Sequence, residues 1–187
     1  MEAQATMTQE YKRRPCEICG YLTCVADKYC TFDICPVCFW EDDGLYEDLE
    51  EPSGANHDLT VNQAKNNFRV FGACDKDMIP HVRKPRAKET PYIESLDEPL
   101  ADVVDLLERF HDGEAVLEDI KDTVFTIIAH DEYDNLPEDI QGVLEFLNMQ
   151  EIENPTLEDS IKARDILKSC LRASRKQHRK NGGRIKP

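Results

Sequence analysis

The stretch PCEICGYLTCVADKYCTFDICPVCFW, residues 15–40, holds six of the chain's eight cysteines and decides the fold of the first half. Four of the six form two Cys-x-x-Cys pairs with fifteen residues between the pairs: Cys16, Cys19, Cys35 and Cys38. Two residues between paired thiolates let a tight turn direct both sulfurs at one ion, and a hairpin that joins two such turns gives a closed tetrahedral site for zinc. Gly20 suits the first turn, which often needs a residue with positive φ. The pattern predicts a zinc ribbon with one structural zinc ion, since four thiolates leave no open position for catalysis.

The cysteines leave other interpretations open. Reduced thiols in a small core, or a redox-active Cys-x-x-Cys pair, have the same spacing. Cys24 and Cys30 can pair with each other, replace a ligand or be small buried residues, while Cys74 and Cys170 stand alone and are expected to be core thiols. The chain begins MEAQATMTQEYKRR, without the apolar stretch of a secretory signal. We therefore expect a cytoplasmic protein, in which clustered cysteines bind metal before they form disulfides.

The charge of the 187-residue chain is strongly acidic and unevenly distributed. Its 38 acidic and 23 basic residues give a formal net charge of -15. Residues 97–160 carry 20 acids and two bases, whereas residues 161–187 carry ten bases and one acid. The overall balance argues against a general nucleic-acid binder, which needs a basic face, and no apolar run is long enough to cross a membrane. Nucleic acid and membrane are therefore not the expected partners.

The order of the motifs predicts an α+β protein with two domains. A small zinc ribbon with a packed helix is expected over residues 13–80, a proline-containing linker over 81–96 and an acidic helical domain over 97–180. The helix of the ribbon domain should cover about 61–72, because Thr60 and Gln63 are spaced as a capping box.

The second domain is expected to be an antiparallel bundle of about four helices. Apolar residues at helical spacing predict the first two over roughly 99–111 and 115–130. Pro137 suits the first turn of a third helix, and Thr156 can cap a fourth. Short connections between the four favour antiparallel neighbours.

The helical domain is expected to bind a basic partner, because its acidic residues are unusually dense. Like charges at such density repel and cost stability, and complementary charge speeds association. A merely solvated acidic face is the alternative, and the loop 41–51 lacks the alternating spacing of an EF-hand calcium site. His111 and His130 end different predicted helices without a nearby nucleophile, so no enzyme is expected. The candidate partner-binding residues are Asp112, Glu114, Glu118, Asp131, Glu132, Asp134, Glu138 and Asp139, with Asp42 and Asp43 from the ribbon loop.

Residues 13–75 contain the segments PCEICGYLT, ICPVCFWEDDG and SGANHDLTVNQAKNNFRVFG. In these segments the chain resembles the bacterial CPCC cysteine-rich family. The chain departs from the family at Glu17 and Ile18, where the family has proline and an additional cysteine, but Cys16 and Cys19 are retained. The resemblance implies an association with polymorphic-toxin loci.

Residues 100–176 resemble small helical immunity proteins of the colicin or contact-dependent-inhibition kind, in the segments LLERFHDGEAVLEDI, LPEDIQGVLEFLN and ARDILKSCLRA. The resemblance implies acidic side chains that bind the active surface of a toxin, often a basic nuclease. We therefore expect an immunity protein that occludes a cognate toxin stoichiometrically. The alternative is a zinc-ribbon nucleic-acid adaptor or regulator that uses Lys12–Arg14 and the basic stretch 172–186.

Overall fold

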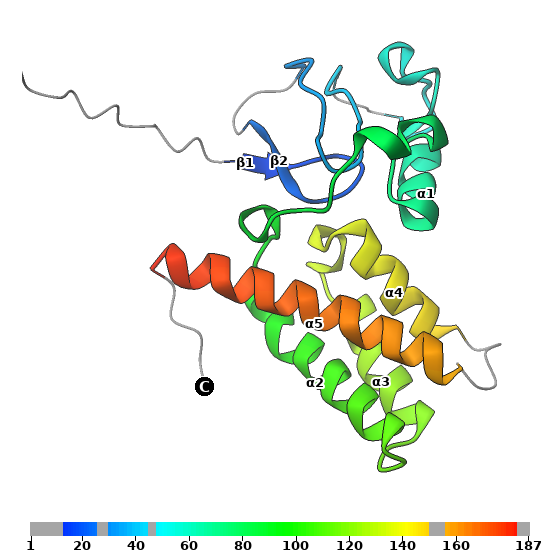
Figure 1. The fold of residues 1–187 in the computed structure, drawn as a ribbon, viewed down its shortest axis with the longest axis vertical. Coiled ribbons are helices and arrows are strands. Elements are labelled where there is room, and N and C mark those ends of the chain that lie inside the picture. The colour runs from blue at the N-terminus through cyan, green and yellow to red at the C-terminus, as the bar shows by residue number, and fades with distance from the viewer. Residues whose placement is uncertain (1–12, 26–29, 45–47, 150–155, 183–187) are drawn as a thin grey trace, which may run out of the picture.

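The computed structural model of the chain describes residues 13–25, 30–44, 48–149 and 156–182. Figure 1 shows a cysteine-rich half above and a bundle of long helices below, joined by one connecting segment. The two halves also pack against each other. Buried side chains form two separate clusters, one in each half. The protein is therefore of the α+β kind that the sequence predicts, although how it divides into domains stays a prediction.

The cysteine-rich half is built on a two-stranded antiparallel sheet. Strand β1, Arg13–Pro15, pairs with β2, Leu22–Val25, with an irregularity between Arg14 and Pro15. After the 3-10 helix η1, Gly54–Asn56, helix α1 covers Val61–Phe71, and the 3-10 helix η2 follows at Lys76–His81. The predicted capping box is confirmed, since the Thr60 side chain accepts from Gln63 N and the Gln63 side chain accepts from Thr60 N. Gly72 ends α1 with a positive φ of 79°.

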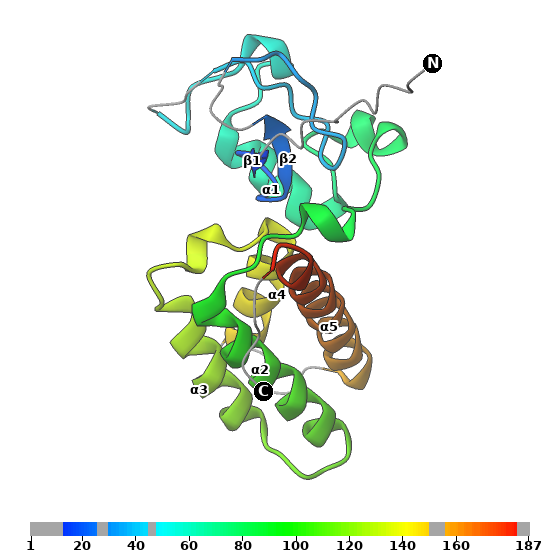
Figure 2. The same ribbon diagram turned by 90° about the vertical axis from the view of Figure 1, so that its left-hand side faces the viewer.

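The helical half contains α2, Glu94–His111, α3, Leu117–Ile128, α4, Glu138–Asn148, and α5, Leu157–Lys180, with the 3-10 helix η4, Tyr133–Asn135, before α4. Helices α2 and α4 each pack against both α3 and α5. Helices α3 and α5 therefore lie on opposite sides of the bundle, as Figure 2 shows. The four predicted helices are present, and Thr156 caps α5 as expected. The core between them includes Leu107, Ile120, Ile140, Leu144 and Leu167.

The segment between η2 and α2, residues 82–93, is here called the strap. It was expected as a linker, but it contains the 3-10 helix η3, Ala87–Glu89, and α2 begins at Glu94, before the predicted start near Pro99. Helix η3 packs against both β2 and α5. Arg83 donates to both carboxylate oxygens of the buried Glu89 at 2.8 Å. Burial alone would raise the pKa of Glu89, but the hydrogen bonds from Arg83 and from the Arg86 amide, with the charges of both arginines, together lower that pKa.

No helix in the described part of the chain is long and apolar enough to cross a membrane.

Candidate metal centre

The four cysteines of the two Cys-x-x-Cys pairs come together at one buried point in the upper half. All the Sγ atoms of Cys16, Cys19, Cys35 and Cys38 lie within 4.8 Å of one another. Across the two pairs, the Sγ atoms of Cys16 and Cys38 are 3.6 Å apart, and those of Cys19 and Cys35 are 3.7 Å apart. Each of the four residues is at most 3% exposed. The set can bind one metal ion, as the cysteine spacing predicts.

Two turns of the same design aim the four sulfurs inward. In the first turn, Gly20 N donates to Cys16 O at 2.9 Å, and Cys16 N donates to Tyr21 O at 2.9 Å. The second turn repeats both bonds at 2.8 Å, from Phe39 N to Cys35 O and from Cys35 N to Trp40 O. The residue after each pair has a positive φ, 73° at Gly20 and 71° at Phe39. The positive φ expected at Gly20 is confirmed. The same conformation at Phe39 was not predicted, because phenylalanine rarely adopts a positive φ.

The electrostatics of the four thiols favour a bound cation. Hydrogen bonds from Cys16 and Cys19 lower the pKa of the Cys35 thiol, and the Thr23 hydroxyl lies 3.1 Å from its sulfur. Burial raises the pKa of Cys19 and of Cys38. Deprotonating the other buried thiols would place several negative charges away from water. This costs free energy unless a positive ion compensates the charges. The arrangement therefore suits thiolates only when a metal ion is present.

The remaining cysteines lie outside this set of four. Cys24 is buried beside Cys16, and its hydrogen bond to Cys16, together with burial, raises the pKa of its thiol. Cys30 is exposed, and Cys74 is buried in the core of the same half. Cys170 packs against the core of the bundle, where burial raises its pKa to about 12. The latter two are core thiols, as expected.

The first cysteine turn docks directly on the start of helix α4. Glu138 N, in the first turn of the helix, donates to Cys19 O at 3.3 Å. The Tyr21 hydroxyl donates to both carboxylate oxygens of Asp139, at 3.0 and 2.9 Å. At Gly20, a Cβ atom would lie 3.0 Å from the Cα of Pro137. The first cysteine turn and the helical bundle therefore form one continuous structure at this point.

Cationic side chains of α1 reinforce that contact. Arg69 Nε donates to a carboxylate oxygen of Glu138 at 2.7 Å, and Lys65 Nζ lies 3.4 Å from the other oxygen. Arg69 also bonds to Glu145 at 3.0 Å. The Glu138 side chain is only 6% exposed. We refer to this contact between the first cysteine turn, α1 and α4 as the turn–α4 interface.

Three of the residues predicted to bind a partner form contacts within the chain. The carboxylates of Glu138 and Asp139 belong to the turn–α4 interface, and a partner contact at these two positions stays a prediction. Asp42 is also buried, where it pairs with Arg14 at 2.7 Å and accepts from the Thr31 hydroxyl at 2.9 Å. Residue type alone does not reveal these contacts, because the three are of the same residue types as their exposed neighbours.

The other predicted partner-binding residues remain at the surface. Asp43 is half-buried and accepts from the Ser53 hydroxyl at 2.7 Å, and Glu132 accepts from the Ser95 hydroxyl. The rest are exposed and lie at the two ends of α3: Asp112, Glu114, Glu118, Asp131 and Asp134. Since α3 has 12 residues, its ends are about 18 Å apart. The structure therefore places these acids in two groups.

The fold and the four clustered cysteines define a ribbon-like site that could hold a metal ion, next to a helical bundle. Residues 14–89 match the family model described as Cysteine-rich CPCC, which confirms the resemblance for this part of the chain and extends it into the strap. No curated protein and no solved structure matches the chain. The likeness of residues 100–176 to helical immunity proteins gains no support from these comparisons.

Gly20→Ala is expected to destabilise the metal-loaded protein more than Gly72→Ala. Both glycines have a positive φ, which costs an L-residue about 1 kcal/mol. A Cβ at Gly72 meets no atom within 4 Å, whereas at Gly20 it would press on the backbone of Pro137 and Leu136. We expect a loss of about 1 kcal/mol for Gly72→Ala and about 2 kcal/mol for Gly20→Ala in urea denaturation. Equal losses would show that the turn does not pack closely on α4.

Proposed function

We propose that the four cysteines hold a single zinc ion whose role is structural. A tetrahedral ion with metal–sulfur bonds of about 2.3 Å needs sulfurs about 3.8 Å apart. The sulfur separations of 3.6 and 3.7 Å across the two turns support this geometry. Because all four ligands are buried thiols, the ion would stabilise the fold and would have no open position for water or substrate.

We further propose that the chain is a bacterial immunity protein, without enzymatic activity, that binds a toxin with a basic active surface. The observation that carries this proposal is the uncompensated acidity around α3. Among the residues that the structure describes, no lysine or arginine forms an ion pair with Glu114, Glu118, Asp119 or Asp122. Repulsion between these side chains costs stability that a basic partner would recover.

Exposed apolar side chains beside these acids support a protein partner in particular. Phe125 is 63% exposed on the outer side of α3, and Val116, directly before the helix, is 60% exposed. Protein interfaces typically combine an apolar or aromatic anchor with a charged rim. We refer to the exposed side of α3 with Glu114, Glu118, Asp119, Asp122 and Phe125 as the acidic surface.

The mechanism would be occlusion and requires no chemistry from this chain. Carboxylates of the acidic surface would pair with the lysines and arginines that a nuclease uses to hold phosphates, and substrate would be excluded. Exposed charge pairs are screened by salt, so association should slow as the ionic strength rises.

Neutralising the acidic surface should abolish protection while leaving the fold intact. The test variant is Glu114→Gln, Glu118→Gln and Asp122→Asn, and the charge-matched control is Glu50→Gln, Glu51→Gln and Asp77→Asn in the cysteine-rich half. Each is co-expressed with the toxin domain encoded in the same locus, and survival and association rates are measured. We expect wild type and control to protect, and the test variant to associate at least about tenfold more slowly. Protection by the test variant, or no protection by the wild type, would contradict the proposal.

A further inference from the structure

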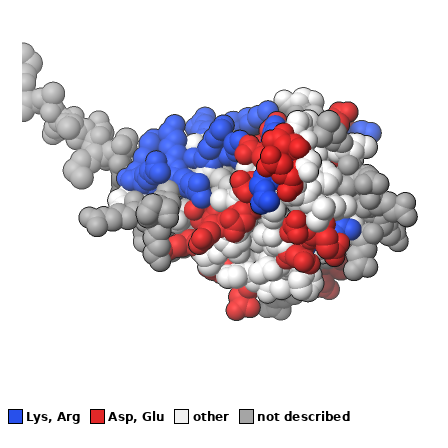
Figure 3. Space-filling view, turned by 90° about the horizontal axis from the view of Figure 1, so that it is seen from below, with Lys and Arg blue, Asp and Glu red and all other residues white. Residues whose placement is uncertain are grey.

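A second charged surface, of opposite sign, lies on the other side of the bundle. The exposed cations of the C-terminal half of α5 and of helix η3 in the strap come together because α5 packs against η3. We call them the basic surface: Arg86, Lys88, Arg172, Lys176, Arg179 and Lys180. Figure 3 shows basic side chains gathered along one side of the molecule, with acidic side chains over much of the rest of the face in view.

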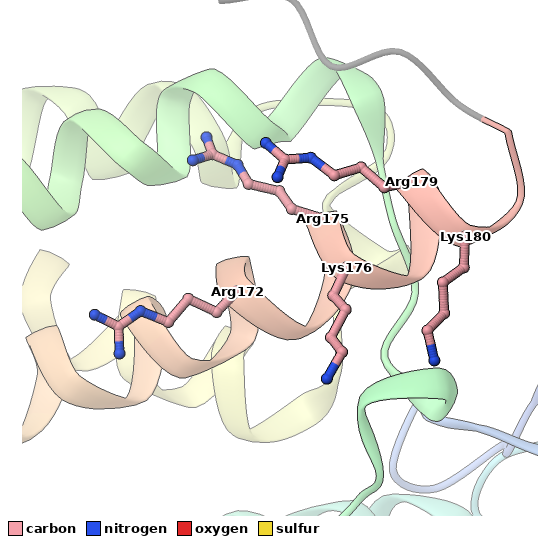
Figure 4. Close-up of a pocket in the computed structure, with 5 residues that line it drawn as sticks. All are labelled: Arg172, Arg175, Lys176, Arg179 and Lys180. Atoms are coloured by element: carbon pink, nitrogen blue, oxygen red, sulfur yellow. The ribbon is translucent and has the colours of Figure 1, made fainter.

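The cations of α5 line an open hollow on the surface. Arg172, Arg175, Lys176, Arg179 and Lys180 surround a space of about 430 Å³. In Figure 4, Lys176 and Lys180 point to one side of α5, while Arg175 and Arg179 lie on the side that faces α2. Among the described residues, Arg175 pairs with Asp97 at 2.9 Å, but no ion pair is formed by any of the six side chains of the basic surface. Their charge is therefore available to a ligand.

Contacts on the inner side of α5 hold these cations in place. Arg175 is bound to Asp97 of α2, and the ring of His178 stacks on Tyr92 of the strap with centroids 3.9 Å apart. The helix dipole places about half a unit of negative charge at the C-terminus of α5. Four cations far exceed this charge, so stabilisation of the helix alone does not explain why they are there. A row of positive charges on a helix that these contacts fix in place suits a polyanion.

We propose that the basic surface binds the phosphate backbone of a nucleic acid strand, without base specificity. Arg172, Lys176 and Lys180 are spaced by four residues and form a row about 12 Å long. Each strand of a duplex offers one phosphate about every 3.4 Å along the helix axis, so the row matches the rise of three or four phosphates. Within the described part of the chain, none of the exposed large apolar side chains lies in the basic surface. This absence favours a nucleic acid over an acidic protein, because protein interfaces centre on apolar anchors.

The proposal is independent of the acidic surface and of any toxin. It differs from the prediction that nucleic acid is an unlikely partner, which rested on the net charge of -15. The proposal uses only part of the basic residues that were predicted to bind nucleic acid. Arg14 is paired with Asp42, and Lys12 and residues 183–187 lie outside the described residues.

The test measures binding of fluorescent 20-nucleotide single-stranded RNA, single-stranded DNA and duplex DNA by the full-length, zinc-loaded protein. We expect dissociation constants in the micromolar range at about 150 mM salt, with little dependence on base sequence. Arg172→Gln, Lys176→Gln and Lys180→Gln together should weaken binding at least tenfold. They should also reduce the slope of log affinity against log salt by about 2. The charge-matched control, Lys76→Gln, Lys121→Gln and Lys162→Gln, should bind like the wild type.

Two results would overturn the proposal. One is the lack of saturable binding to any of the three probes at about 50 mM salt, where electrostatic binding is strongest. The other is an equal loss of affinity in the test variant and its control, which would assign binding to net charge and not to this surface. Circular dichroism of both variants shows whether the fold is retained, as expected for substitutions of solvent-accessible side chains.

Discussion

Cys38→Ser is expected to abolish stoichiometric zinc binding and to unfold the cysteine-rich half. Structural zinc sites of four thiolates contribute about 10 kcal/mol or more to folding, which is comparable to the whole stability of a small domain. Zinc is measured after gel filtration, and folding is followed by fluorescence. The single tryptophan of the chain, Trp40, is an internal reporter because it is buried two residues from Cys38. Its emission should shift to longer wavelength in the variant.

Cys30→Ser is the matched control for this experiment, because Cys30 is exposed and lies outside the set of four. It should retain one zinc per chain and the emission of the wild type. One zinc per chain in Cys38→Ser would refute the four-cysteine site.

The loss of zinc should also lower the local stability of the helical bundle. The first cysteine turn supplies Cys19 O to the first turn of α4 and Tyr21 to Asp139. When the turn unfolds, these partners are lost, so backbone amides in α4 should exchange with deuterium faster in Cys38→Ser than in Cys30→Ser. Unchanged exchange would show that the bundle is stable without the turn.

Glu138→Ala should cost about 3 kcal/mol of unfolding free energy, the second largest effect that we expect. The substitution removes the buried partner of Arg69 and Lys65 and leaves a partly buried guanidinium short of an acceptor. Glu145→Ala is the control, since the Glu145 side chain bonds to the same Arg69 but is 45% exposed. We expect about 0.5 kcal/mol for this exposed pair. Urea denaturation of the zinc-loaded proteins gives both values.

A double variant, Arg69→Met with Glu138→Leu, removes both charges of the pair. It therefore separates the stability that the ion pair contributes from the cost of leaving Arg69 without its partner. If the unpaired arginine causes the loss in Glu138→Ala, the double variant should regain part of it. Losses of similar size in Glu138→Ala and Glu145→Ala would contradict the structural importance of the buried carboxylate.

Local patterns predicted most of the helices and the cluster of four cysteines. The spacing of Cys16, Cys19, Cys35 and Cys38 identified the site because a Cys-x-x-Cys turn determines the positions of its sulfurs within a few residues. Thr60 and Thr156 marked helix starts for the same reason, since a cap bonds to the next turn of its own helix.

The contacts between the halves were not predictable from such patterns. Glu138 and Asp139 differ from the exposed Asp131 and Asp134 only in their partners, and Arg69 and Tyr21 lie about 70 and 120 residues away in the chain. The strap was expected as a linker because of its prolines and its few apolar residues. Its packing depends on the ion pair of Arg83 with the buried Glu89 and on contacts with β2 and α5. Amino-acid composition does not reveal such contacts.

The placement of α3 and α5 on opposite sides of the bundle separates the acidic surface from the basic surface. At physiological ionic strength an exposed charge is screened over about 8 Å, whereas two helices packed side by side are already about 8–10 Å apart between their axes. A molecule that approaches one side therefore experiences the sign of that side and little of the other. The chain as a whole is an anion, but at close range it acts as an electric dipole, and the orientation of an encounter decides whether it is attractive.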